Sequence, residues 1–220
     1  MYLMTATRPD LAFSVSNCAR FISNPSEEHI KALQRIWQYV RTSQNKGLLY
    51  NLNSSNTLDL IGYVDSDWGG DYTTRKSTTG YLFLFGNTPV SWSSKLQKSV
   101  AISSCEAEYM ALKEAAKELI WLKSVFKQII PLNKYNTDLL YCDNKSAIDL
   151  LKNLEHHAKT KHINIQYHFI RDYIERNIFK LQYINTKEQL ADALTKAIDI
   201  NSFRNFTKKI NIVENDIKNR

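Results

Sequence analysis

Cysteines are few in this sequence, and long apolar runs are missing. The 220 residues include three cysteines, Cys18, Cys105 and Cys142, which lie far apart and lack the paired spacing of zinc ligands. The sequence therefore indicates neither a disulfide framework nor a zinc site, and we expect a reducing compartment. No apolar run approaches the roughly 18 residues of a membrane span, and the first residues do not resemble a signal peptide. We expect a cytoplasmic or nuclear protein that is neither secreted nor membrane-bound.

The composition is that of a soluble globular protein with a moderate excess of basic residues. Hydrophobic residues make up 43% of the chain and charged residues 23%, which is enough to bury a sizeable core. The formal net charge is +7. This charge is compatible with a polyanionic partner but does not require one.

The first 45 residues show helical periodicity. An amphipathic helix is predicted between Pro9 and Asn24, and a second one begins with Asn24 as its N-cap and Pro25 at its first position. The apolar stripe of the second helix consists of Ile30, Leu33, Trp37 and Val40. We expect these helices to form a small module, or an appendage that needs a surface to pack on.

From about residue 58 the pattern changes to strands. The segment 58–64 is rich in strand formers and ends at Asp65, the run 81–85 is apolar and aromatic, and 90–93 alternates apolar with polar residues. Gly86-Asn87 marks a turn, so an antiparallel meander of three strands is predicted. Taken alone, Asp65 is equally well explained as a solvated strand end. The basic, hydroxyl-rich loop 73–78 is either solvated or a phosphate-binding segment.

The next predicted helix gives its two glutamates different surroundings. Ser103 and Glu106 have the spacing of a capping box, which gives Glu106 a structural role at the helix start. Glu108 instead lies on the apolar stripe and needs a cation as partner, unless it reaches water in a frayed first turn. The apolar stripe consists of Leu112, Ala115, Leu119 and Leu122.

A second acidic strand end follows at Asp143-Asn144, after the apolar run 139–142 and before a predicted helix at 146–151. A helix around 163–174 and a strand at 179–184 come next. His156, His157, His162 and His168 lack a recognisable ligand spacing and are better explained as solvated or core histidines. In the closing helix, 188–194, Asp192 lies off the Leu190-Leu194 face, which is typical of an exposed residue.

Four acids can converge in this arrangement of elements. Asp65 and Asp143 end strands, while Glu108 and Asp192 lie near helix starts. Four carboxylates without matching bases repel one another, and oxygen-only ligation favours Mg²⁺ or Mn²⁺ over zinc. Two such ions about 4 Å apart support phosphodiester hydrolysis.

Seven segments of this sequence resemble the ribonuclease H domain of copia-type retrotransposon polyproteins. They are GYVDSDWGGD (62–71), RKSTTGY (75–81), SWSSK (91–95), EAEY (106–109), YCDN (141–144), KTKHI (159–163) and QLAD (189–192). The resemblance covers residues 56–200. Residues 1–55 resemble the end of the reverse transcriptase region, and 201–220 form a basic tail. The resemblance implies a C-terminal fragment of a polyprotein that lacks the polymerase aspartates, the integrase and the protease.

The resemblance implies an α/β fold in which helices flank a mixed five-stranded sheet, preceded by the small helical segment. It places the metal-binding and catalytic acids at Asp65, Glu108, Asp143 and Asp192, with two Mg²⁺ or Mn²⁺ ions, and Asp192 depends mainly on the resemblance. The implied substrate is an RNA-DNA hybrid. Weaker candidates for contacts with its strands are Arg75, Lys76, Ser77, Trp92 and Asn144. Residues 183–192 contain no histidine, so the mobile histidine of cellular ribonucleases H has no counterpart there.

The resemblance predicts a Mg²⁺-dependent endonuclease that cuts the RNA strand of RNA-DNA hybrids during reverse transcription. A non-catalytic nucleic-acid-binding or structural relic of a retrotransposon polyprotein is the alternative, because a fragment without its reverse transcriptase partner can lose affinity for the hybrid. A transposase-like nuclease is less consistent with the motifs.

Overall fold

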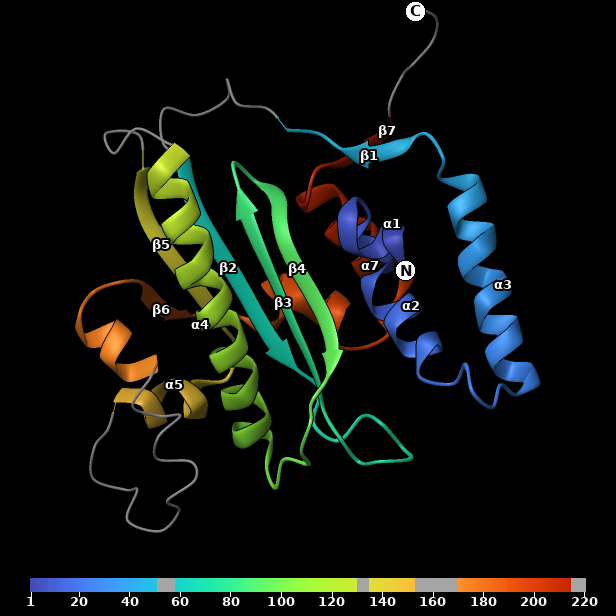
Figure 1. Cartoon of the computed structure of the whole chain (residues 1–220), viewed down its shortest axis with the longest axis horizontal. Helices are drawn as coiled ribbons and strands as arrows, with labels where there is room; N and C mark the ends of the chain where they lie inside the picture. The colour runs from blue at the N-terminus through green and yellow to red at the C-terminus, as the bar shows by residue number, and fades with distance from the viewer. Residues whose placement is uncertain (51–57, 130–134, 153–169, 215–220) are drawn as a thin grey trace, which may run out of the picture.

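A mixed five-stranded sheet runs through the middle of the molecule, as the computed structural model shows (Figure 1). The structure describes residues 1–50, 58–129, 135–152 and 170–214. The strands are β2 (Leu58–Ser66), β3 (Thr78–Phe85), β4 (Thr88–Leu96), β5 (Tyr135–Cys142) and β6 (Lys180–Tyr183). Their order is β4-β3-β2-β5-β6, with antiparallel pairing from β2 to β4 and parallel pairing of β2, β5 and β6. The α/β architecture implied by the resemblance, a mixed five-stranded sheet flanked by helices, is confirmed.

The predicted turn at Gly86-Asn87 closes the hairpin between β3 and β4. Both residues have positive φ, +58° at Gly86 and +64° at Asn87. A two-residue hairpin loop needs this backbone because its twist then matches that of the strands, and Gly and Asn adopt it at low cost. The predicted three-stranded meander is confirmed.

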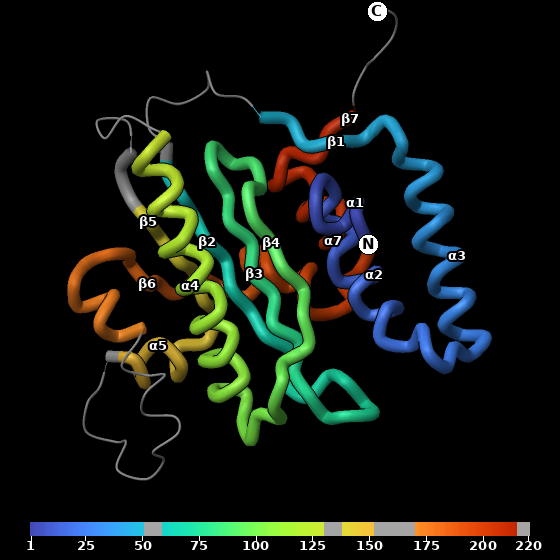
Figure 2. Tube along the Cα trace, viewed as in Figure 1, coloured from blue at the N-terminus to red at the C-terminus, as the bar shows by residue number. Residues whose placement is uncertain are grey.

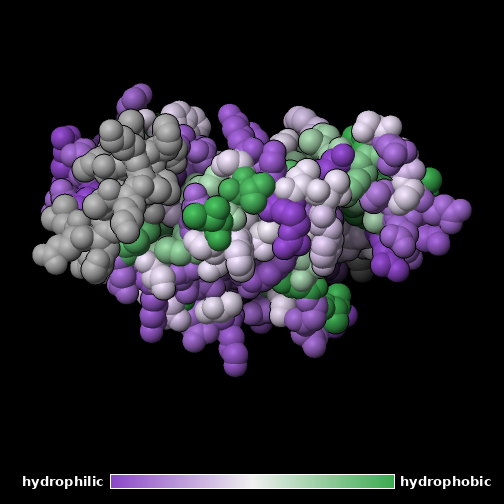
Figure 3. All heavy atoms as spheres, turned by 90° about the horizontal axis from the view of Figure 1, so that it is seen from below, coloured by the Kyte–Doolittle hydropathy of each residue, from purple (hydrophilic) through white to green (hydrophobic). Residues whose placement is uncertain are grey.

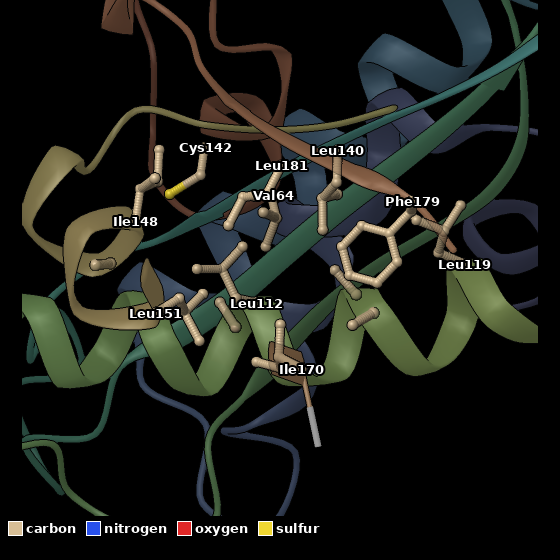
Figure 4. Packing of buried hydrophobic residues seen from close by; sticks show 14 of the residues in the cluster. Val64, Leu112, Leu119, Leu140, Cys142, Ile148, Leu151, Ile170, Phe179 and Leu181 are labelled. Atoms are coloured by element: carbon tan, nitrogen blue, oxygen red, sulfur yellow. The ribbon is translucent and has the colours of Figure 1, made fainter. Parts of the chain in front are cut away.

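Helix α4 (Ser104–Ile129) lies along one face of the sheet and covers the main core (Figure 1). Figure 4 shows side chains from β2, β5, β6, α4 and α5 (Lys145–Lys152) meeting there. The predicted apolar stripe of α4 is confirmed, because all four of its residues are buried in this cluster. The predicted helix around 163–174 is described only at 170–175, where Ile170 joins the same core.

The opposite face of the sheet carries a second core. Successive residues of a strand point to opposite faces, so Leu82 and Leu84 of β3 turn away from Phe83, which packs under α4. They meet η4 (Leu190–Leu194), a 3-10 helix, and α7 (Ile200–Lys209). The buried residues of this cluster are Ala12, Leu82, Leu84, Leu190, Leu194, Phe206, Ile210 and Ile212.

The N-terminal helices differ from the prediction at their starts. The first one is divided into η1 (Pro9–Leu11), which is a 3-10 turn, and α2 (Ala12–Ala19), and they follow the short α1 (Tyr2–Ala6). Helix α3 (Glu27–Thr42) begins two residues later than predicted, because Ser26 is its N-cap and the Ser26 N–H donates to His29 Nδ1 at 3.0 Å. The predicted N-cap role of Asn24 is therefore wrong.

A buried ion pair attaches α3 to the segment that precedes α2. Arg8 and Asp10 are both buried, and Arg8 Nη2 lies 2.8 Å from Asp10 Oδ2. Tyr39 of α3 donates to the same oxygen at 2.7 Å, and Arg8 also donates to the Ser43 hydroxyl at 2.8 Å. A buried ion pair is tolerated when its remaining donors and acceptors are satisfied, as they are here.

The apolar stripe of α3 is exposed in the part of the chain that the structure describes. Ile30, Leu33 and Trp37 retain 49%, 58% and 66% of their accessible surface. The periodicity predicted the helix correctly, but this face does not pack on the sheet.

Residues near both ends of the chain pack against the central sheet and against each other. Strand β1 (Lys46–Leu48) pairs antiparallel with β7 (Ile212–Glu214), and the two segments lie next to each other in Figure 2. Trp92 of β4 donates its indole N–H to the Met4 carbonyl at 2.6 Å, and Ser16 of α2 donates to the Ser94 carbonyl at 2.9 Å. Contacts thus cross the expected boundaries at 55/56 and 200/201, and the division into three parts stays a prediction.

Candidate metal centre

The carboxyl ends of two neighbouring parallel strands bring Asp65 and Asp143 together. Val64 of β2 pairs with Cys142 of β5, so the acid that follows each of them lies at the same edge of the sheet. Glu108 reaches this edge from the second turn of α4, and Asp192 reaches it from η4. Four elements that are distant in sequence therefore deliver one acid each.

The oxygens of these acids lie close enough to share a cation. One carboxylate oxygen each from Asp65, Asp143 and Asp192 lies within 4.8 Å of the others. Glu108, Cys142 and Asp143 form a second group with the same limit. Asp143 belongs to both groups, so the four acids form one continuous cluster. Three of them, Asp65, Glu108 and Asp143, line an open pocket of about 510 Å³.

Burial and mutual repulsion make ionisation costly in this cluster. Glu108 is only 5% exposed, and burial, followed by the charges of Asp65 and Asp143, raises its pKa to about 9. Burial and then the charge of Asp65 raise the pKa of Asp192 to about 6. The pKa of Asp143 is also raised, mainly by burial. The cluster therefore has more negative charge than its own surroundings neutralise.

Segment 189–195 is fixed to the strand that carries Asp65. The Thr195 hydroxyl donates to Asp65 Oδ2, and Gln189 Nε2 donates to the Val64 carbonyl at 2.9 Å. Gly80, the register partner of Asp65 on β3, leaves room for this segment: a Cβ there would lie 2.6 Å from Thr195 Cγ2 and 3.1 Å from the Ala191 carbonyl oxygen. Sheet and segment thus hold Asp65 and Asp192 at fixed positions.

Gly80→Ala is expected to destabilise the protein by about 1–3 kcal/mol, because the added methyl group forces η4 away from β3. The melting temperature should fall by about 2–4 °C per kcal/mol for a chain of this size. Gly47→Ala is the control, since a Cβ at Gly47 has no atom within 4 Å, and it should melt like wild type. Equal melting temperatures of the two variants would show that the segment does not pack tightly on Gly80.

Two lysines also line the pocket, and they have different partners. Lys196 Nζ lies 2.9 Å from Asp192 Oδ1. Burial alone would lower the pKa of Lys196, but the neighbouring charges of Asp65, Asp192 and Asp143 outweigh burial and raise it. Lys145 Nζ instead lies over the Tyr183 ring, 4.6 Å from its centroid.

The donor chemistry of the cluster fits a hard divalent cation. Its carboxylates supply only oxygen ligands, and burial leaves them short of positive charge, which is what Mg²⁺ or Mn²⁺ supplies. The Cys142 thiol donates to Glu108 Oε2 at 3.9 Å, and burial raises its pKa, so it remains protonated and is a poor ligand.

The structure separates the roles of Glu106 and Glu108 as the capping pattern predicts. The Glu106 N–H donates to the Ser103 hydroxyl at 3.1 Å, and the Glu106 carboxylate accepts from the Ile102 N–H at 2.7 Å. Glu108 lies in the pocket, and its Oε1 accepts from the Ser66 N–H at 3.2 Å. The exposed helical position considered for Asp192 is wrong, because its side chain is only 18% exposed and 188–194 forms 3-10 turns instead of an α-helix.

Among the candidates for strand contacts, only Asn144 lines the pocket with the acids. Its side-chain oxygen also accepts from the Ala147 N–H at 3.0 Å, which caps α5. Arg75 is exposed and Lys76 partly exposed on the loop after β2. Ser77 is fully buried, and its hydroxyl accepts a hydrogen bond from the Gly69 N–H at 3.0 Å. The Trp92 indole N–H donates to the Met4 carbonyl. Ser77 and Trp92 thus have structural partners within the chain.

Three residues that hold the acids in place had no role assigned from the sequence: Lys196, Thr195 and Gln189, although Gln189 lies in the QLAD segment. A signal for Lys196 was present, since a lysine four residues after an aspartate in a helical segment reaches back to it. The four histidines and the KTKHI motif lie outside the described residues.

Comparison with known proteins places the chain in a family, although no family model matches it. The Pol polyprotein of transposon TNT 1-94 from Nicotiana tabacum is 46% identical over 203 residues, which are 92% of this chain and 15% of the polyprotein. The Pol polyprotein of transposon RE1 from Arabidopsis thaliana is 39% identical over 206 residues, 94% of this chain and 14% of the polyprotein. A crystal structure of LC11-RNase H1 in complex with an RNA/DNA hybrid aligns with a TM-score of 0.46 and 15% identity, covering 62% of this chain and 93% of that one.

This chain belongs to the Pol polyproteins of copia-type retrotransposons and corresponds to their C-terminal region. It spans only 15% of the length of the TNT 1-94 polyprotein and 14% of that of the RE1 polyprotein. Their names do not say which segment carries which activity.

Proposed function

We propose that this chain is a Mg²⁺-dependent endonuclease that hydrolyses the RNA strand of RNA-DNA hybrids as part of retrotransposon reverse transcription. The observation that carries the proposal is the convergence of Asp65, Glu108, Asp143 and Asp192 from four separate elements. Buried acids that outnumber the bases paired with them destabilise a fold, and Lys196 pairs with only one of the four, so their convergence is best explained by a cation-dependent reaction.

The four acids would hold two divalent ions, which supply an activated water and stabilise the charge on the leaving oxygen when bound. Asp65 and Asp143 come from the rigid sheet, and the Thr195 hydroxyl orients the Asp65 carboxylate. The backbone N–H of Ser66 orients Glu108 in the same way. The open pocket then leaves room for a phosphodiester next to the acids.

Basic side chains at the pocket are compatible with a polyanionic substrate, since Lys145 and Lys196 line it together with the acids. Figure 3 shows the molecule from below the view of Figure 1, where the coloured part of the surface is mainly hydrophilic with a few separate hydrophobic groups. Asn144 lines the pocket, and Arg75 and Lys76 lie on the surface of the loop that follows the Asp65 strand. We infer that the RNA strand is bound through its 2′-hydroxyls and the DNA strand through its phosphates, a mode that recognises the shape of a hybrid.

The proposal is tested by giving the wild-type chain four duplexes or strands of one sequence: the RNA-DNA hybrid, double-stranded RNA, double-stranded DNA and single-stranded RNA. We expect cleavage of the hybrid in Mg²⁺ and none in EDTA. Faster cleavage of double-stranded DNA than of the hybrid would contradict the proposed substrate.

We also propose that α2 and α3 contact the reverse transcriptase part of the polyprotein. Residues of the two helices line an apolar groove of about 410 Å³, which includes Val15, Ile22, Ile30 and Leu33. Exposed apolar patches next to such grooves mark interaction sites. The groove belongs to the segment whose sequence resembles the end of the reverse transcriptase region.

Replacing Ile30 and Leu33, which both line the groove, together with Ser is expected to change the melting temperature by about 2 °C or less, because both side chains are exposed. The double variant should lose binding to the segment that precedes the matching region in the TNT 1-94 polyprotein, measured by pull-down. Trp121→Ser, at a 57% exposed position on α4, is the matched control and should bind normally. Equal binding by the double variant and the control would contradict this role of α3.

None of the described helices is long and apolar enough to cross a membrane.

A further inference from the structure

The Lys196 ammonium group lies among the acids of the pocket. Its Nζ is 2.9 Å from Asp192 Oδ1, and it lines the pocket together with Asp65, Glu108 and Asp143. The Lys196 side chain is 45% exposed and that of Asp192 is 18% exposed, so the ammonium group is partly open to solvent and the carboxylate is mostly covered. Lys145 lines the same pocket but is placed over the Tyr183 ring.

The backbone after η4 fixes Lys196 in this position. The N–H groups of Thr195 and Lys196 both donate to the Asp192 carbonyl, at 3.2 and 3.1 Å. The turn aims two consecutive side chains at two different acids, with the Thr195 hydroxyl on Asp65 and the Lys196 ammonium on Asp192. Thr195 is completely buried, which anchors the turn.

We propose that Lys196 is a built-in counter-ion of Asp192, which competes with a divalent cation for this carboxylate. The inference rests on the proposed metal site. A carboxylate that already has an ammonium partner at 2.9 Å gains less from a second cation, and the two positive charges repel each other. The cation that contacts Asp192 should therefore bind more weakly than the cation held by the acids that Lys196 does not pair with.

The proposal predicts how Mn²⁺ binding responds to the loss of the ammonium charge. Lys196→Gln should tighten the weaker Mn²⁺ binding event by about 10-fold, as expected from removing one nearby positive charge, and leave the stronger event unchanged. The same variant should melt at a lower temperature than wild type in EDTA, since the acids lose their counter-ion. Lys117→Gln should match wild type in both measurements, because Lys117 pairs with Glu114 at an exposed position of α4 and does not line the pocket.

The experiment is isothermal titration of the metal-free proteins with Mn²⁺, combined with thermal unfolding in EDTA. Lys196→Arg keeps the charge and should bind Mn²⁺ like wild type, which separates loss of charge from disruption of the turn. In a background of Asp192→Asn, Lys196→Gln should no longer change Mn²⁺ affinity. Unchanged or weaker Mn²⁺ binding by Lys196→Gln, with wild type binding normally, would overturn the counter-ion role alone. A folded wild type that binds no Mn²⁺ would overturn the metal site and this inference together.

Discussion

Asp65→Asn is expected to reduce Mg²⁺-dependent cleavage of an RNA-DNA hybrid by more than about 100-fold, because even the loss of groups that only orient metal ligands costs 10–100-fold. Asp65 is 4% exposed and shares the cluster with Asp143 and Asp192. Asn keeps an oxygen that can accept the Thr195 hydroxyl, so the packing of the segment should survive. The substitution thus removes the negative charge of residue 65 but keeps the size and shape of its side chain. Single-turnover cleavage measures the effect.

The matched control for Asp65→Asn is Asp149→Asn, on the exposed side of α5. It should cleave like wild type. In EDTA, Asp65→Asn should also melt at a higher temperature than wild type, because one of several repelling charges has gone. A variant that is both active and no more stable than wild type would show that Asp65 does not belong to a charged metal site.

Without divalent ions, the protein is expected to lose stability as the pH rises from about 5 to about 9. The folded state raises the pKa of Glu108 to about 9 and that of Asp192 to about 6, chiefly through burial. The unfolded chain releases these protons at the ordinary carboxyl values, so it binds fewer protons than the folded chain throughout this range. Rising pH therefore favours unfolding. The stability that these two protonated acids contribute is lost completely above the pKa of Glu108 in the folded state.

The melting temperature in EDTA should fall by roughly 10 °C across this range, given about 2–4 °C per kcal/mol for a chain of this size. The charges that face Glu108 and Asp192 are Asp65, Asp143 and Lys196, and Lys196 stays positive throughout because its pKa is raised. Mg²⁺ should remove most of the decline, since a bound cation stabilises the ionised acids.

In Glu108→Gln the melting temperature should depend much less on pH, because the substitution removes the acid whose pKa is raised most. Differential scanning fluorimetry of wild type and Glu108→Gln at several pH values, with EDTA or Mg²⁺, makes the comparison. A wild-type melting temperature that rises between pH 5 and pH 9 in EDTA would contradict the electrostatics of the cluster.

The sheet and two of its acids are predictable because strand patterns are local. The runs that end at Asp65 and Asp143 become parallel neighbours in the sheet, and their register puts the acids side by side. Glu108 was predictable from the helical wheel, since a carboxylate on the buried stripe of α4 is costly without a cation as partner. The strand and helix periodicity of the sequence is therefore sufficient to identify Asp65, Asp143 and Glu108 as site residues.

The position of Asp192 could not be predicted from its own segment. In an α-helix it would lie off the Leu190-Leu194 face, but the segment forms 3-10 turns held by Gln189 and Thr195 against β2. Those contacts are tertiary and span more than a hundred residues of sequence. A similar limit applies to Trp92, whose hydrogen-bond partner Met4 lies 88 residues away in the sequence.

The stripe of α3 shows a different limit. Periodicity identifies an apolar face but not the surface that covers it, and Leu33 and Trp37 are exposed in the part of the chain that the structure describes.

Cleavage of an RNA-DNA hybrid labelled on both strands, by wild type and by Asp143→Asn, tests the proposed function most directly. Asp143 is the acid that both groups of the cluster share. We expect wild type to cut the RNA strand alone, only with Mg²⁺, and folded Asp143→Asn to cut neither strand. A folded wild-type protein that leaves the hybrid intact in Mg²⁺, or equal cleavage by Asp143→Asn, would contradict it.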